Sequence, residues 1–76
     1  MIIVYVLITH ISGDDPDVCV FRKEDDAIFN ARRFCINLLQ DNNIKHNPYD
    51  NLERLWELCC IEHCLGYYTI EEQTVL

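Results

Sequence analysis

The chain opens with an apolar run from Ile2 to Ile11 that only Thr9 and His10 interrupt. The run lacks the alternation of a half-buried strand, so it predicts a central strand that is covered on both faces. Positions 12–17 follow and are dense in glycine, aspartate and proline, which favour turns. The short segment Val18–Phe21 then predicts a second strand that forms a hairpin with the first.

Two later segments have helical spacing. Apolar residues recur every three or four positions from Lys23 to Asp41, which predicts an amphipathic helix with an acidic first turn. Asp50 is expected to begin a second helix, with Glu53 three residues later in an approximate capping box. Gly66 is the natural residue to end that helix. The segment Tyr67–Leu76 predicts a third strand.

The predicted ββααβ order describes one α+β domain over residues 1–76. We expect a three-stranded sheet in the order 2-1-3, with two antiparallel helices on one face. The first and third strands should then be parallel, with a right-handed connection through the helices. Such helices leave one apolar face of the central strand open, and an open apolar face marks an interface. The open set is either Ile2, Val4, Val6 and Ile8, or Ile3, Tyr5 and Leu7.

Composition narrows the function classes. Half of the 76 residues are hydrophobic and two are glycine, so the chain should fold rather than stay disordered. Thirteen acids against six bases give a net charge of −7, which disfavours direct binding to nucleic acid and to anionic membranes. The apolar start is shorter than the roughly 20 residues of a membrane span and lacks a signal peptide's basic region. We therefore expect an intracellular, cytoplasmic protein.

One segment concentrates reactive side chains within six residues: Cys59, Cys60, His63 and Cys64. Pairs at i and i+4 can each supply two metal ligands, whereas a structural zinc site needs four. His10 and Cys19 are expected at the opposite end of the domain, so only Cys35 could complete a set. An odd total of five cysteines also indicates free thiols rather than a disulfide framework. We expect no metal and no cofactor, and keep a metal- or redox-responsive module as the alternative.

The same cysteines have simpler roles. On a helical wheel Cys59 joins the apolar stripe and should be buried, because a free cysteine packs as a small hydrophobe. Cys60, Ile61 and Cys64 fall on the other side and form an outward apolar patch. Together with the sheet residues Tyr5 and Leu7, this patch is our predicted contact surface for a protein partner or a second copy. Short loops and few glycines offer no substrate pocket, so we do not expect an enzyme.

The acidic residues predict a second contact surface. The hairpin acids Asp14, Asp15 and Asp17 should lie at the same end as Asp50. Glu53 and Glu57 would extend this array along the exposed helix face, and the array could imitate nucleic-acid phosphates in the basic cleft of a partner. Ordinary turn chemistry and a solvated helix face explain the same residues without a partner.

A family resemblance rests on short segments at both ends of the chain. These are Val4–His10, the Gly-Asp turn, Val18–Phe21, Glu24–Ala27 and Tyr67–Glu72. They resemble small phage and virus accessory proteins, some of which inhibit host defences such as CRISPR nucleases. The cysteine-rich helix departs from that pattern, and no site residue carries over. The sequence thus predicts a small acidic protein-binding module, an inhibitor or adaptor of viral or phage type that forms a homodimer.

Overall fold

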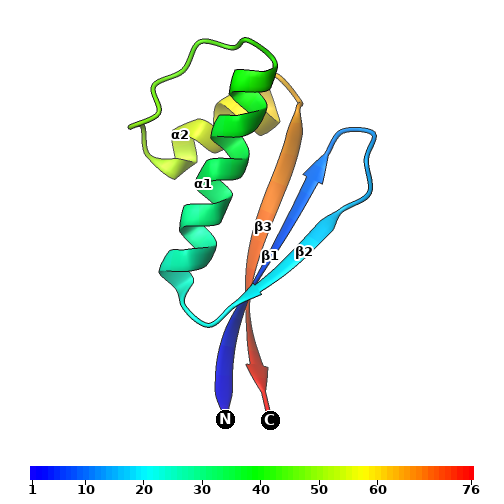
Figure 1. Cartoon of the computed structure of the whole chain (residues 1–76), viewed down its shortest axis with the longest axis vertical. Coiled ribbons are helices and arrows are strands. Elements are labelled where there is room, and N and C mark those ends of the chain that lie inside the picture. The colour runs from blue at the N-terminus through cyan, green and yellow to red at the C-terminus, as the bar shows by residue number, and fades with distance from the viewer.

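A computed structural model describes all 76 residues (Figure 1). Its elements, in chain order, are β1 (Ile2–Ile11), β2 (Asp17–Phe21), α1 (Glu24–Asp41), α2 (Leu52–Trp56), the π-helical turn η1 (Glu57–Glu62) and β3 (Gly66–Val75). This is the predicted α+β fold, and the sheet has the predicted order β2-β1-β3 with two helices on one face. None of its helices has the length and apolar character that crossing a membrane requires.

The expected parallel pairing of the first and third strands is wrong. β3 runs antiparallel to β1, with Gly66 opposite Ile11 and Val75 opposite Ile2. After α1 the chain turns back through the loop 42–51, and α2 and η1, with five and six residues, then run toward the end of β1 instead of returning to the start of α1 (Figure 1). The helical segment ends near the end of β1 (Figure 1), so β3 starts there and runs back along the strand.

The ends of the second helix also differ from the prediction. Asn51, and not Asp50, is the N-cap: its side-chain oxygen accepts a hydrogen bond from the Arg54 backbone N–H at 2.8 Å. An asparagine in this place satisfies one of the free N–H groups of the first turn. At the other end Cys64, and not Gly66, takes the left-handed conformation, with φ of 49°.

Gly66 has a different role. A side chain there would collide with the carbonyl oxygen of His10 on the neighbouring strand and crowd Leu38 of α1 at 3.2 Å. The glycine therefore allows β3 to begin closely packed between β1 and the helix.

The core lies between the helices and one face of the sheet. Its fully buried large side chains are Cys35 and Leu39 of α1, Leu55 of α2 and Cys59 of η1. Leu7 of β1 closes the core from the sheet side and is 3% exposed. No polar or charged residue is buried, and no side-chain nitrogen or oxygen atom is buried without a hydrogen-bond partner.

The two faces of the sheet are covered unequally. Tyr5 and Leu7 point toward the helices, so the even-numbered residues of β1 point away. On that far side Val6 pairs with Val20 of β2 and Ile8 pairs with Val18, and both β2 valines are 61% exposed. The side of the central strand that faces away from the helices is therefore the first alternative, Ile2, Val4, Val6 and Ile8. On this side Ile2 is 49% exposed, Val4 and Ile8 are half-buried, and Val6 is buried at 9% exposure.

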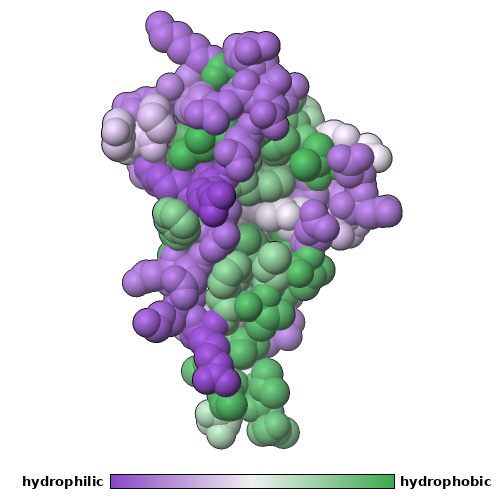
Figure 2. All heavy atoms as spheres, viewed as in Figure 1, coloured by the Kyte–Doolittle hydropathy of each residue, from purple (hydrophilic) through white to green (hydrophobic).

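The sheet narrows to a two-stranded ribbon at one end. β2 pairs with β1 only from Tyr5 to Thr9, so Ile2, Ile3 and Val4 pair with β3 alone. The ribbon projects beyond the helices, and it carries both termini (Figure 1). Figure 2 shows this end as an apolar region. Ile2, Ile3 and Val75 in the ribbon are about half-exposed. A two-stranded ribbon has little stability by itself in water.

Candidate protein-contact surfaces

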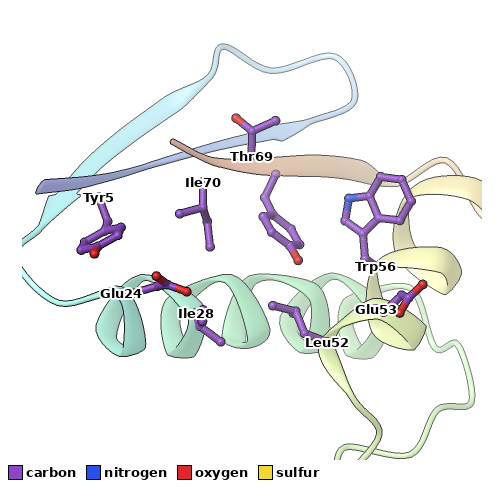
Figure 3. A pocket seen from close by; sticks show the side chains of 9 residues that line it. Tyr5, Glu24, Ile28, Leu52, Glu53, Trp56, Thr69 and Ile70 are labelled. Carbon is purple, nitrogen blue, oxygen red and sulfur yellow. The ribbon is translucent and has the colours of Figure 1, made fainter. Parts of the chain in front are cut away.

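The uncovered face is the side of the sheet opposite the helices. Strand alternation and register assign twelve residues to it: Ile2, Val4, Val6, Ile8, His10, Val18, Val20, Tyr67, Thr69, Glu71, Gln73 and Val75. Figure 3 shows Thr69 pointing away from the helices, in agreement with this assignment. The His10 and Tyr67 rings lie side by side at one end, with centroids 5.1 Å apart. Glu71 is the one carboxylate in the set, although the chain has thirteen acids.

The contact patch predicted from the sequence is only partly on the surface. Leu7 lies under the helices and cannot contact a partner, because the helices cover the odd-numbered side of β1 and not the even-numbered side. Tyr5 is half-buried on the same helix side. Cys60 packs against the core, and this burial raises the pKa of its thiol to about 12. Ile61 is 60% exposed and Cys64 is exposed, so these two residues remain accessible to a partner.

The acidic residues do not form one end. The hairpin loop between β1 and β2, which carries Asp14 and Asp15, lies on the other side of α1 from α2 and its preceding loop (Figure 1). The chain reaches α2 through the loop 42–51, which runs along the far side of α1 from the hairpin. Asp50 is half-buried there, and its backbone carbonyl accepts a hydrogen bond from Arg32.

The remaining three acids differ in their surroundings. Asp17 begins β2 and lines a hollow with Arg33 of α1. Glu57 forms an ion pair with Arg54 at 3.3 Å, so part of its charge is neutralised. Glu53 is exposed and has no ion-pair partner, and it lines the largest hollow of the molecule. Of the predicted acids on α2 and η1, Glu53 is therefore the one whose charge is free to meet a partner.

The cysteine and histidine residues do not assemble a metal site. No group of three or more histidine, cysteine or acidic side chains is arranged to hold a metal ion. Cys59 and Cys35 are both buried in the core cluster, and the proximity of the two thiols raises the pKa of Cys35. His63 is exposed at the end of η1, and the Cys64 thiol donates to the Ile61 carbonyl oxygen at 3.7 Å.

His10 lies elsewhere than expected. It lines a hollow of about 220 Å³ together with Cys60, Cys64 and Tyr67, whereas the sequence placed it at the opposite end of the domain. Because β3 is antiparallel to β1, it starts next to the end of β1. Cys60 and Cys64, which precede β3 in the chain, therefore lie beside His10. The two thiols and the imidazole share this hollow without forming a ligand set.

The sequence did not predict the largest hollow, which we call the aromatic groove. It has a volume of about 730 Å³ and lies between the helix side of the sheet, α1 and α2. Figure 3 shows Tyr5 and Ile70 pointing from the sheet toward α1, with Trp56 at the α2 end. The groove is lined by Tyr5, Glu24, Ile28, Leu52, Glu53, Trp56, Tyr68 and Ile70, and Thr69 borders it although its side chain points to the uncovered face. The groove exists because α2 is too short to cover the sheet beside the start of α1.

The electrostatics of the aromatic groove are acidic. Burial and the nearby carboxylates of Glu72 and Glu24 raise the pKa of the Tyr5 hydroxyl. Burial raises the pKa of Tyr68 to about 12. No lysine or arginine lines the groove. The one signal in the sequence was the occurrence of three aromatic residues, Tyr5, Trp56 and Tyr68, in segments that the fold brings together.

Comparison with family models, with curated proteins and with solved structures finds no match for this chain.

Proposed function

We propose that this chain is a non-catalytic protein-binding module that pairs with a second copy of itself through the uncovered face. The observation that carries the proposal is that β1 is apolar on both sides while the chain supplies helices on only one. Val18 and Val20 are 61% exposed on that face, and burying an apolar side chain fully contributes about 1.5–3 kcal/mol. Covering these exposed apolar side chains with another molecule is therefore favourable in free energy.

A second copy of the chain is the partner that best fits the low charge of the uncovered face. The chain has a net charge of −7, but the uncovered face holds a single acid, Glu71. Two such faces can meet about a two-fold axis while most of the negative charge stays outside the contact. A stable interface takes about 800 Å² from each partner, which is roughly a seventh of the 5348 Å² that this chain exposes. Two sheets packed about 10 Å apart, face to face, supply such a contact.

In the cell, the module is proposed to act as an inhibitor or adaptor. Support for this role comes from the resemblance to phage and virus accessory proteins, and from the accessible surfaces on the helix side that remain free when the sheet faces pair. A cytoplasmic location, in the host cell of a virus or phage, belongs to the same proposal.

Sedimentation equilibrium at micromolar concentration tests the pairing with two matched substitutions. Val20→Lys places a charge in the uncovered face, and Ile61→Lys places one at an equally exposed apolar position outside it, at 61% and 60% exposure. The parent chain and Ile61→Lys should sediment as dimers and Val20→Lys as a monomer. A monomeric parent chain would overturn the pairing. Dissociation by Ile61→Lys alone would instead assign the contact to the patch around Cys60, Ile61 and Cys64.

A further inference from the structure

Building on the proposed protein-binding function, we infer that the aromatic groove binds an arginine side chain presented by the partner protein. Three kinds of side chain in the groove point to this ligand: aromatic rings, apolar floor residues and unpaired carboxylates. The uncovered face and the groove lie on opposite sides of the sheet, so a paired copy does not block the groove.

The rings supply a surface for a flat cation. Tyr5 and Tyr68 extend from the sheet and Trp56 from α2, and all three line the same hollow. A guanidinium group stacks on aromatic faces, and the attraction contributes about 0.5–2 kcal/mol according to how far water is excluded. Ile28, Leu52 and Ile70 complete the lining and can pack against the methylene groups of an arginine stem.

The carboxylates supply the charge. Glu24 of α1 and Glu53 of α2 line the groove, and Glu72 of β3 lies close enough to Tyr5 to raise its pKa. The two ion pairs of the molecule both belong to Arg54, with Glu57 and Glu62, so none of the groove carboxylates is paired. Arg32, on α1, is held by the carbonyl oxygens of Pro48 and Asp50. The groove therefore has negative charge beside rings and no cation of its own.

The shape of the groove favours a side chain of a protein over a small enclosed metabolite. The hollow is open along one side, so a main chain can pass outside while one side chain enters. Its volume of about 730 Å³ lies within the range of ordinary ligand sites. In this inference an arginine of the predicted basic partner contacts Glu53, which belongs to the acidic set predicted from the sequence. The hairpin acids of that set take no part in the contact.

Trp56 makes the test direct, because it is the one tryptophan of the chain and it lines the groove. N-acetyl-arginine amide serves as the probe, and N-acetyl-citrulline amide is its uncharged counterpart of similar size. Tryptophan fluorescence of the full chain should change on titration with the arginine probe. We expect a dissociation constant of about 1–10 mM, as suits a ligand of this size. The citrulline probe should bind clearly more weakly.

Matched charge variants locate the contact. The double variant Glu24→Gln with Glu53→Gln should weaken binding about fivefold, as expected for two exposed ion pairs. The control Asp14→Asn with Asp15→Asn changes the net charge equally at the hairpin and should leave binding unchanged. Tyr5→Leu, which keeps an apolar side chain but removes a ring, should also weaken binding.

Three results would overturn the inference. These are equal binding of the two probes, equal weakening by the two double variants, and no fluorescence change up to about 50 mM, well above the expected dissociation constant. Sedimentation separates this failure from failure of the proposed pairing, since loss of groove binding in a chain that still forms dimers removes only the arginine contact.

Discussion

The two faces of the sheet differ although they share the same central strand. Leu7 points to the helices and is 3% exposed. On the far face, Val6 of the same strand is 9% exposed, whereas Val20 of the edge strand β2 is 61% exposed. The central strand is apolar on both faces, so its composition does not distinguish them. The difference arises because an apolar strand needs a cover on each side, and this chain has helices for only one. A hydrophobic surface that a small domain does not cover itself is available to another molecule.

The largest expected effect comes from the covered side. Leu55→Ala removes a fully buried side chain and should destabilise the fold by about 2–5 kcal/mol. Val18→Ala on the uncovered face should cost about 0.5 kcal/mol or less, because water already reaches that side chain. Urea denaturation of both variants in the Val20→Lys background measures the difference without a contribution from pairing. Equal losses of stability would show that the two faces are not covered as described.

Gly66 sharpens the comparison at the point where β3 begins. Gly66→Ala places a methyl group against the His10 carbonyl oxygen and Leu38, and the crowding should destabilise by about 1–3 kcal/mol. Gly13→Ala is the control for the loss of a glycine: its site is open, with nothing within 4 Å, but its φ of 91° also disfavours a side chain. We expect a smaller loss for Gly13→Ala, of about 1 kcal/mol. The reverse order would mean that β3 is not closely packed at its start.

A smaller effect on stability is expected at alkaline pH, and it comes from Tyr68 on the helix side of the sheet. Burial raises the pKa of Tyr68 from 10.0 to about 12, so the unfolded chain loses this proton first. The contribution of Tyr68 to stability is fully present below pH 10 and is lost as the pH rises toward 12. The urea midpoint should therefore fall between pH 9 and pH 11.5, and it should fall less in Tyr68→Phe. An identical fall in both proteins would contradict the burial of this hydroxyl.

Much of the fold followed from hydrophobic spacing. The continuous apolar run of β1 gave its central position, and the three-to-four spacing gave α1 almost to the residue. The first strand is apolar on both faces, and the predicted helices could cover only one face of the sheet. The sequence therefore also predicted that the other face of the sheet would lack a cover. These features depend on the local hydrophobic pattern and on the number of helices available to cover the sheet. The sequence indicates both.

The direction of β3 and the sites that depend on it were not predictable in the same way. Periodicity suggested a long second helix, but the regular α-helix ends after Trp56 and η1 continues it only to Glu62. That length decides where the chain rejoins the sheet, and so whether His10 lies near Cys60 or far from it. The aromatic groove has the same origin, since Tyr5 and Trp56 meet only because α2 leaves part of the sheet uncovered.

The most direct test of the central claim is a measurement of contacts between two copies. A sample mixed from isotope-labelled and unlabelled chains gives isotope-filtered nuclear Overhauser effects only across an interface. We predict such effects between copies at the methyl groups of Val18, Val20 and Ile8. Their absence, or effects confined to Ile61 and its neighbours, would contradict the claim that a second copy covers the open face of the sheet.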